Sequence, residues 1–364
     1  WLNRYGFHVT VVERAPELRP GGQNVDFKGG PHFTVLERMG ILDQVRALQT
    51  GGIDQLIVDA DDKELTRMPG EFSGGELEIN RGVLAQVLYE HTRDDVEYIF
   101  ADSITSLTET ASGVHVTFER SAPRTFDLVV GADGIHSNVR RLSFGPEKDY
   151  VHYLGHYYAL SSLDREFGPI GRMYNEPGRM VAAGGAKSPA FFVFASEELT
   201  YDRYDDEQQK AIVAKAYEGM GWKTAEVVDA TRHAKDFYLD TISQVRVDTY
   251  AKGRVALLGD AAYGNTLAGF GTGLALVGAY VLAGELALAR GNYQKAFQSY
   301  WEEFHTYAKI ARNGNAGPFL APGTPAKIRM RNWMFKYGFL MGLMMKLTDK
   351  FASNITLKNY DELI

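Results

Sequence analysis

The sequence contains no cysteine among its 364 residues. This absence excludes a disulfide framework, a thiolate metal site and a cysteine nucleophile, and it agrees with a cytoplasmic location. Lysine and arginine form no continuous run, and the net charge of −7 argues against a nucleic-acid partner. No secretory signal is visible. We therefore expect a cytoplasmic protein without a nucleic-acid partner.

Long hydrophobic runs are also missing. The most apolar stretch, Trp333–Leu347, is interrupted by Lys336 and is too short to span a bilayer, so we expect no stable membrane insertion. Its methionines have roughly helical spacing, which predicts a helix packed on the core: Met330, Met334, Met341, Met344 and Met345. The hydrophobic fraction of 45% and the charged fraction of 23% are globular values, and the length suffices for one large or two ordinary domains.

Side chains that could form a metal site or act as a nucleophile lack the neighbours they would need. His152 and His156 are four residues apart, but Tyr150–Tyr158 is predicted to be a strand, which separates them. No carboxylate spacing completes a metal site with them or with His136. Ser137 lacks the flanking glycines of a nucleophile elbow. We therefore expect no metal and no catalytic side chain.

The most informative segment is a Gly-Asp pair at positions 259 and 260. Val255–Leu258 is a continuous apolar run, which predicts a buried parallel strand, and a helical pattern begins near Leu274. Four glycines lie between the pair and the helix: Gly264, Gly269, Gly271 and Gly273. Asp260 would lie where α/β sheets bind nucleotides and could accept hydrogen bonds from sugar or ribityl hydroxyls. Glycines let a flat ring approach, and the helix dipole would favour an anionic reduced flavin. The alternative is an ordinary turn with a capping Asp.

Two further segments carry nucleotide-binding signals. The predicted strand Asp127–Val130 leads into Gly131–Arg141, which contains Asp133-Gly134 and ends in two arginines at a helix start, a pattern that suits a dinucleotide pyrophosphate. The short β-branched run Val9–Val12 ends in Glu13-Arg14, and an acid at that place typically holds the adenosine ribose. Taken alone, Glu13 is better explained as an ordinary solvated residue.

Together, in this order and spacing, the three segments resemble the FAD-dependent aromatic hydroxylases, the single-component flavoprotein monooxygenases similar to para-hydroxybenzoate hydroxylase. The resemblance covers nearly the whole chain. Within the family the sequence is most similar to the branch that contains tetracycline-inactivating monooxygenases. The stretches that carry this similarity are Gly21–Asp26, Glu78–Leu84, Val277–Leu286 and Ser353–Leu357.

The resemblance implies a set of binding residues. For FAD they are Glu13, Arg14, Arg81, Asp133, Gly134, Asp260, Gly269, Gly271, Thr272 and Gly273. Gln23 and Asp26 would line the flavin pocket on its substrate side. Aromatic and flexible apolar side chains are candidates for the substrate wall, although each taken alone is better explained as a core residue: Tyr158, Met173, Phe192, Phe194 and Phe319.

The resemblance also implies an activity. FAD, reduced by NADPH or NADH, would react with O2 to give a flavin C4a-hydroperoxide that hydroxylates an aromatic or polycyclic, polyketide-like small molecule. Tetracycline is one candidate among many, which makes antibiotic resistance a candidate role. The protein would bind, orient and exclude water. Two alternatives stay open: a flavin-dependent reductase or dehydrogenase of an isoprenoid-type substrate, and a flavin-free small-molecule binding protein.

Two departures from the family pattern bear on these expectations. The first strand and the Gly-x-Gly-x-x-Gly phosphate loop are missing, and Trp1–Gly6 is predicted to be the last turns of the helix that follows that loop. We therefore expect the sequence to be a piece of a longer gene product. The second departure is Tyr263–Leu267, which replaces the usual histidine and prolines after Asp260, so the rigidity of the flavin loop and the substrate specificity could differ.

These segments predict an α/β fold: a Rossmann-like FAD-binding domain without its first strand, an inserted substrate domain with a mixed or antiparallel sheet, and C-terminal helices. The FAD-binding domain would comprise 1–48, 79–148 and 242–300, the substrate domain 49–78 and 149–241, and the C-terminal helical segment 301–364. The predicted elements outside the motifs are the strands Ile53–Asp59 and Ala190–Ala195 and the helices Gln208–Gly219, Leu274–Arg290 and Tyr293–Arg312. The oligomeric state stays open.

Overall fold

The computed structural model describes residues 1–19, 22–52, 54–70, 75–185, 189–337, 342 and 352–363. Its largest sheet is formed by apolar strands whose residues alternate in burial. Every neighbouring pair in this sheet is antiparallel except β12 with β3. Its strand order is β15 (Phe237–Val245), β11 (Val151–Ser161), β14 (Ala190–Ala195), β13 (Arg179–Ala183), β12 (Arg172–Glu176), β3 (Gln55–Val58) and β4 (Glu64–Met68).

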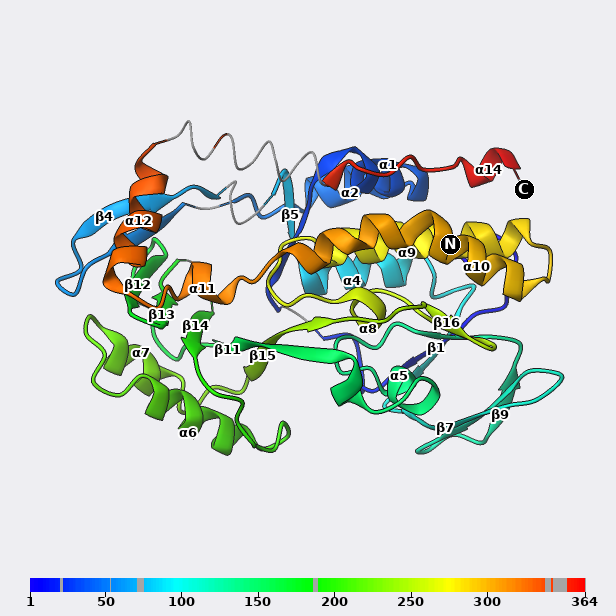
Figure 1. The fold of residues 1–364 in the computed structure, drawn as a ribbon, viewed down its shortest axis with the longest axis horizontal. Helices are drawn as coiled ribbons and strands as arrows, with labels where there is room; N and C mark the ends of the chain where they lie inside the picture. The colour runs from blue at the N-terminus through cyan, green and yellow to red at the C-terminus, as the bar shows by residue number, and fades with distance from the viewer. Residues whose placement is uncertain are drawn as a thin grey trace.

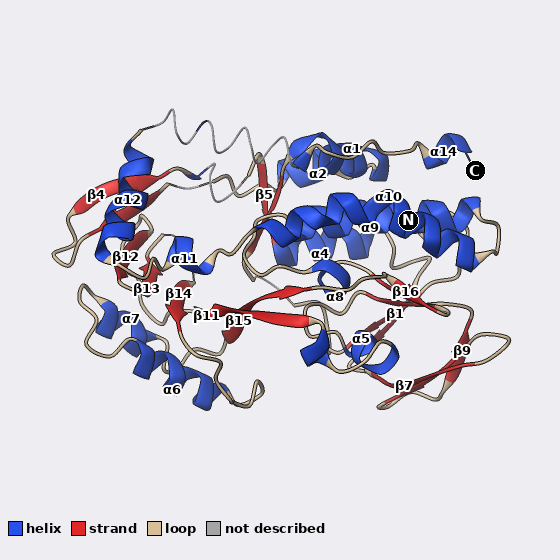
Figure 2. Ribbon diagram, in the orientation of Figure 1, coloured by secondary structure: helices blue, strands red, loops and turns tan. Residues whose placement is uncertain are grey.

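Helices cover both faces of this sheet (Figures 1 and 2). On one face lie α6 (Asp206–Ala216) and α7 (Thr224–Ala230), and on the other lie α11 (Gly317–Leu320) and α12 (Pro325–Lys336). Because successive strand residues point to opposite faces, the same strands supply two separate apolar clusters. We call them the α6 face and the α11 face.

Two short parallel pairs lie in the other half of the molecule. β1 (Thr10–Glu13) pairs with β6 (Glu97–Phe100), and β10 (Val129–Gly131) pairs with β17 (Val255–Leu257). β1 and β10 do not pair with each other, and a cavity of about 2230 Å³ lies between them. Smaller sheets complete this half: β16 (Ala251–Lys252) on β17, the meander β7 (Ile104–Glu109), β8 (Val114–Phe118) and β9 (Arg124–Phe126), and the pair β2 (Asn24–Phe27) and β5 (Leu77–Asn80).

The long helix α9 (Gly271–Leu288) is the centre of the core beside these sheets. It packs against α1 (Gly29–Met39), α10 (Tyr293–Ala308) and β2, as the ribbons show (Figure 1). By length and composition it is the one helix in the described ranges that could cross a membrane. Because 61% of it is buried inside the protein, α9 is a core helix. The remaining helices are α2 (Leu42–Ala47), α4 (Arg81–Glu90), α5 (Asn138–Ser143), α8 (Asp260–Tyr263), α14 (Tyr360–Leu363) and the 3₁₀ turns Glu147–Asp149 and Lys309–Asn313.

The predicted fold class is confirmed: the protein is mixed α/β, with parallel strands in one half and a mostly antiparallel sheet in the other. The strand Ala190–Ala195 has the predicted bounds. The helix predicted at Tyr293–Arg312 is helical to Ala308 and continues as a 3₁₀ turn. Ile53, Gly21, Met341, Met344 and Met345, which the sequence analysis singled out, lie outside the described residues. The division into three discontinuous domains stays a prediction.

The helix predicted within the methionine-rich stretch begins earlier than expected, at Pro325. Its start has a local signal: the Thr324 side chain accepts a hydrogen bond from the Lys327 backbone N–H, and a proline stands in the first turn. The methionine spacing does not mark the buried face of this helix: Met330 is exposed, and the buried residues are Arg331, Asn332 and Phe335.

We predict that Gly131→Ala destabilises the protein. A Cβ at Gly131 would lie 2.8 Å from Val139 Cβ in α5 and 3.0 Å from Leu257 Cδ2, so β10, β17 and α5 would have to separate. Overpacking of this kind costs about 1–3 kcal/mol, measurable by chemical denaturation. Gly30→Ala is the matched control, because nothing lies within 4 Å of its added Cβ. Equal stability of the Gly131→Ala variant and wild type would refute the packing argument.

Candidate active site

The turn that follows β10 is organised by Asp133. One carboxylate oxygen accepts the Val139 backbone N–H at 2.9 Å and the other accepts the Ser137 hydroxyl. The Ser137 oxygen in turn accepts the Arg140 backbone N–H at 2.9 Å and caps α5. Asp133, predicted to bind cofactor, therefore fixes the turn that begins α5, and Gly134 supplies the left-handed conformation (φ 83°) within it.

The turn that follows β17 presents a carboxylate without a partner. Gly259 adopts φ 63° and ψ −143°, a conformation that needs glycine, and α8 begins at Asp260. The Asp260 side chain is open to solvent and makes no hydrogen bond within the described ranges. Desolvation by the surrounding protein nevertheless raises the pKa of its carboxyl. A Cβ at Gly271 would stand 3.5 Å from Asp260 Oδ1, so Asp260 lies beside the start of α9.

Arg140 joins these two turns. Its guanidinium is fully buried and donates to the Ala261 carbonyl at 2.8 Å and to the Ile135 carbonyl at 2.6 Å. The strands that lead to the turns are neighbours, because Gly131 stands opposite Leu257 in the parallel register. The two predicted aspartates therefore follow adjacent strand ends. Arg140 was only part of a basic pair in the sequence, and nothing local indicated its partner 121 residues away.

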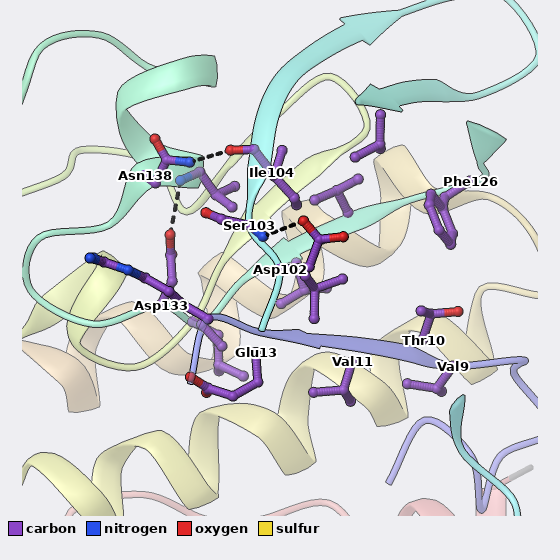
Figure 3. Close-up of a pocket in the computed structure, with 18 of the residues that line it drawn as sticks. Val9, Thr10, Val11, Glu13, Asp102, Ser103, Ile104, Phe126, Asp133 and Asn138 are labelled. Carbon is purple, nitrogen blue, oxygen red and sulfur yellow. Dashed lines mark hydrogen bonds between the residues drawn. The ribbon is translucent and has the colours of Figure 1, made fainter. Parts of the chain in front are cut away.

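The cavity between β1 and β10 collects four of the predicted cofactor residues: Glu13, Arg14, Arg81 and Asp133. In Figure 3, Glu13 and Asp133 lie toward one end of this cavity, and Val9, Thr10 and Phe126 lie toward the other. Asp260 does not line this cavity, although Leu258 of the same turn does. The inner edges of β1 and β10 have no strand partner within the described ranges.

Glu13 and Arg14 stand at the end of β1 with different partners. Glu13 Oε1 accepts the Ala15 backbone N–H at 2.7 Å, and its side chain remains exposed. Arg14 donates to the Tyr204 hydroxyl at 2.9 Å and lies 4.6 Å from that ring. A ligand that uses Arg14 would therefore share it with Tyr204.

Arg81 begins α4 directly after β5. Its backbone N–H donates to the Gln23 carbonyl at 3.1 Å, and Asn80 caps the helix through the Gly82 and Val83 N–H groups. The guanidinium lies against Gly22 and is exposed, with no hydrogen bond or ion pair within the described ranges. The β2–β5 pair thus places the Arg81 guanidinium, which has no partner within the described ranges, at the cavity.

The predicted glycine loop divides into two environments. Gly271 faces Asp260, whereas a Cβ at Gly273 would overlap the imidazole of buried His32. Gly273 therefore gives room to a core histidine rather than to a ligand. Gly269 is exposed with φ 79° and nothing near its added Cβ, and Thr272 is half-buried in the first turn of α9.

The predicted wall residues lie on both faces of the large sheet. Phe192 and Phe194 belong to the α6 face, where both rings contact Tyr217. Met173, Tyr158 and Phe319 lie on the α11 face. Leu267, which belongs to the loop after Asp260, packs on the α11 face too. Phe192 and Phe194 are therefore core residues on the far side and are not part of the site proposed below; their neighbours Phe191 and Val193 point the other way.

Gln23 lies just before β2, where its carbonyl accepts the Arg81 N–H, and Asp26 lies on β2. Gln23 is exposed. Asp26 stands opposite Glu78 and lies 3.5 Å from Lys28 Nζ, and one of its carboxylate oxygens has no hydrogen-bond partner. Burial raises the pKa of the Asp26 carboxyl despite the opposing effect of Lys28.

A second polar cluster, which the sequence analysis missed, lies between the Asp133 turn and the large sheet. His136 Nδ1 is 3.0 Å from Glu147 Oε1, and its Nε2 is 3.0 Å from both carboxylate oxygens of Asp240 on β15. Burial disfavours the imidazolium, but hydrogen bonds to Asp240 and Glu147 outweigh it and raise the pKa of His136 to about 9. The signal in the sequence was the single charged residue, Asp240, in the strand Phe237–Val245.

Groups of three or more histidine, aspartate or glutamate side chains that could hold a metal do not occur among the residues that the structure describes. His152 and His156 lie on β11 at a break in its register with β15. His136 is instead held by two carboxylates, as described above.

Proteins similar in sequence and in structure are consistent with this geometry. A sequence profile described as FAD binding domain matches residues 1–311. The chain belongs to this FAD-binding family. A flavin-dependent monooxygenase of Legionella longbeachae is 36% identical over 312 residues, covering 82% of this chain and 79% of that protein. An uncharacterized protein of Mycobacterium tuberculosis is 42% identical over 322 residues, covering 85% and 86%. The crystal structure of tetracycline destructase Tet(51) has a TM-score of 0.84 at 29% identity, covering 99% of this chain and 95% of that one.

The predicted family and activity are confirmed: the protein is an FAD-dependent monooxygenase, and FAD is its cofactor. The residues present fit that cofactor. The unpartnered Asp260 carboxylate and exposed Glu13 are hydrogen-bond acceptors for hydroxyl groups, the free Arg81 guanidinium suits an anionic group, and Gly271 leaves open the space beside Asp260. Which of these residues touch FAD stays a prediction.

We predict that His136→Gln lowers stability in a pH-dependent way. The pKa of His136 is raised from the ordinary 6.5 to about 9 in the folded protein. Its ion pairs therefore stabilise fully below pH 6.5, and this stabilisation is lost as pH rises through about 9. The loss at pH 6 should be about 2 kcal/mol, measured by chemical denaturation.

The same experiment at pH 9.5 and above should show a much smaller difference between the His136→Gln variant and wild type. His233→Gln is the control, because His233 is exposed. A difference that does not change with pH would contradict the ionised state of His136.

Proposed function

We propose that this monooxygenase uses NADPH or NADH to hydroxylate an aromatic or polycyclic, tetracycline-like small molecule with O2. The observation that carries the proposal is the unpartnered Asp260 carboxylate at the start of α9, in a chain that follows a tetracycline destructase over 99% of its length. FAD supplies the two-electron chemistry and the activation of O2 when it is bound. The chain's own residues bind, orient and exclude water.

We assign the binding roles from the contacts described above. Glu13, assisted by Arg14, holds the adenosine ribose. Asp133 and Gly134 shape the turn next to the dinucleotide. Asp260, with Gly271 and Thr272 at the positive end of the α9 dipole, and Arg81 across the β2–β5 pair hold the flavin side. Gly269 keeps the approach to this loop open.

The substrate would lie on the α11 face. Tyr158, Met173 and Phe319 share that face and give an apolar, aromatic wall, which suits a polycyclic ligand. Gln23 and Asp26 would meet the substrate from β2. A half-buried carboxyl with a raised pKa, as at Asp26, can donate as well as accept a hydrogen bond.

The proposal includes the organisation of the chain. The FAD-binding domain would comprise 1–48, 79–148 and 242–300, the substrate domain 49–78 and 149–241, and the C-terminal helical segment 301–364, of which α11 and α12 pack on the α11 face. We place the enzyme in the cytoplasm, where NAD(P)H is available and a cysteine-free chain needs no oxidising compartment.

The deciding experiment incubates purified FAD-loaded protein with NADPH or NADH, O2 and a panel of tetracyclines and simple phenols. We expect consumption of the reduced nucleotide and a product heavier than its substrate by one oxygen atom, with 18O incorporated from labelled O2. A product without added oxygen would indicate a reductase or dehydrogenase instead. A protein that purifies without flavin and binds none would indicate a binding protein.

We predict that Asp260→Ala weakens FAD binding about 10-fold and thereby lowers the FAD content of the purified protein. The estimate assumes the loss of one hydrogen bond from a hydroxyl to a charged group, worth about 1.5 kcal/mol. Absorbance of the bound flavin at equal protein concentration measures it. Asp94→Ala is the control, because the Asp94 side chain is 87% exposed. Unchanged flavin content in Asp260→Ala would remove Asp260 from the site.

A further inference from the structure

Helix α12 turns large apolar side chains outward and polar ones inward. Its buried residues are Arg331, Asn332 and Phe335. The side chains with the largest exposed apolar area lie on the other side of the helix: Met330 is 60% exposed, and Trp333 and Tyr337 are each 51% exposed. A surface helix normally directs such residues to the core, so this arrangement indicates an interaction surface.

The exposed apolar side chains form one contiguous group. Met330, Trp333 and Tyr337 are three and four residues apart, so they share one face of the helix. The rings of Trp333 and Tyr337 are in contact, with their centroids 4.7 Å apart. Single exposed apolar residues are normal, but a contiguous group marks a site of contact with a partner. We call these three residues the α12 stripe.

Contacts on the buried side fix this orientation of α12. The Arg331 guanidinium donates to the carbonyls of Phe319 at 3.1 Å and Leu320 at 3.0 Å, and to Asn175 Oδ1 at 2.8 Å. Phe335 packs edge-on against Phe319 on the α11 face. Rotating α12 to bury the stripe would break these hydrogen bonds to a charged group and expose Phe335. The stripe therefore faces outward in the folded protein.

Basic residues flank the α12 stripe. By helical periodicity Lys327 lies on one side of it and Arg329 and Lys336 lie on the other, and all three are exposed. The sequence of α12 contains no acid, and neither does the wider range 304–348, in a chain whose net charge is −7. The outer face of α12 is thus apolar along its middle and positively charged along both edges.

The acids of the strands next to α12 are already paired. The helix packs against β4 and β12. Glu64, the acid of β4, lies 2.8 Å from Arg67 Nε, and Glu176, the acid of β12, lies 2.6 Å from Arg179 Nη2. No ion pair joins the flanking lysines and arginine of α12 to any acid within the described ranges. Their positive charge is therefore available to a partner.

This combination of side chains suits a lipid surface. Trp and Tyr favour the boundary between lipid headgroups and acyl chains, and Lys and Arg are attracted to anionic headgroups. A second copy of this chain fits less well, because a symmetric contact between two α12 helices would bring the same positive charges together. Adsorption to a lipid surface also needs no spanning segment.

We propose that the α12 stripe and its basic flanks bind the surface of an anionic phospholipid bilayer, with the protein peripheral to the membrane. Figure 1 shows α12 at one end of the molecule, beside β4 and β12. In the cytoplasm, where we place the protein, the membrane leaflet that it would meet is the anionic one. The proposal goes beyond the proposed function and does not depend on it.

Binding through α12 has a consequence for the α11 face. Helices α11 and α12 cover this face, where the proposed substrate wall of Tyr158, Met173 and Phe319 lies. A bilayer bound to the outer side of α12 would therefore lie next to that wall. Apolar polycyclic compounds partition from water into lipid, so the enzyme would meet its proposed class of substrate where that substrate is concentrated.

The deciding experiment is sedimentation of the FAD-loaded protein with lipid vesicles. One set of vesicles contains phosphatidylcholine with about one-third phosphatidylserine, and the other contains phosphatidylcholine alone. The salt concentration is about 0.1 M, where the Debye length of about 10 Å screens charges on distant parts of the protein. We expect the protein to sediment with the mixed vesicles, to stay in solution with the neutral ones, and to be released by about 1 M salt.

Two variants test the residues of α12. Replacing Lys327, Arg329 and Lys336 together by Gln should weaken binding about 100-fold, because each basic residue near an anionic surface contributes about fivefold. Trp333→Ala should weaken binding about 10-fold through the loss of apolar contact. All these side chains are exposed, so we expect FAD content and the denaturation midpoint to stay at their wild-type values.

The matched control replaces Lys215, Lys235 and Lys252 together by Gln. It removes the same charge from exposed positions on other elements and should bind like wild type. Equal weakening in this control would overturn the assignment to α12, as would equal binding to neutral vesicles or no binding to the mixed ones. A wild-type dimer that Trp333→Ala converts to a monomer, measured by light scattering, would assign the stripe to a second copy and refute the membrane. A wild-type enzyme that inserts no oxygen refutes the proposed function and leaves the vesicle result standing.

Discussion

The buried guanidinium of Arg140 is the contact on which the candidate site depends. It holds the carbonyls of Ile135 and Ala261, so the turns after β10 and β17 cannot move independently. No ion pair compensates its charge within the described ranges, and burial lowers its pKa. Burying a charge is costly unless its donors are used; Nη1 and Nη2 of Arg140 each donate to a carbonyl, whereas its buried Nε has no partner among the described residues. The site thereby gains a fixed positive charge behind both turns, which suits a cofactor that carries phosphates and becomes anionic on reduction.

The start of α9 shows how closely the site and the core are joined. Gly271 leaves room beside Asp260, and two residues later Gly273 leaves room for His32 in the core. One helical turn therefore directs one glycine toward Asp260 and the other toward a buried histidine. The orientation of the helix that directs its dipole toward the site is set by core packing against α1 and α10, and not by the ligand.

Much of the fold was predictable from local patterns, and the limits have physical causes. Apolar runs followed by an Asp-Gly turn at 133–134 and by a Gly-Asp pair at 259–260 located β10, β17 and their turns, because strand burial and turn conformation are short-range properties. Phe192 and Phe194 could not be assigned to a face of the sheet from the sequence. Aromatic side chains stand on both sides of β14, and only the neighbouring elements determine which side faces which helices. Arg140 and Asp240 find their partners 121 and 104 residues away, so no spacing along the chain could reveal them.

The large sheet keeps its two faces chemically separate. The α6 face is closed by helices and holds Phe192, Phe194 and Tyr217 in tight aromatic contact. The α11 face carries Tyr158, Met173 and Phe191 on the intervening positions of the same strands. Alternate residues of one strand therefore meet different neighbours, the helices α6 and α7 on one side and α11 and α12 on the other. A substitution on the α11 face has to be accommodated by α11 and α12 alone, and the aromatic packing on the opposite side of the same strand keeps its partners.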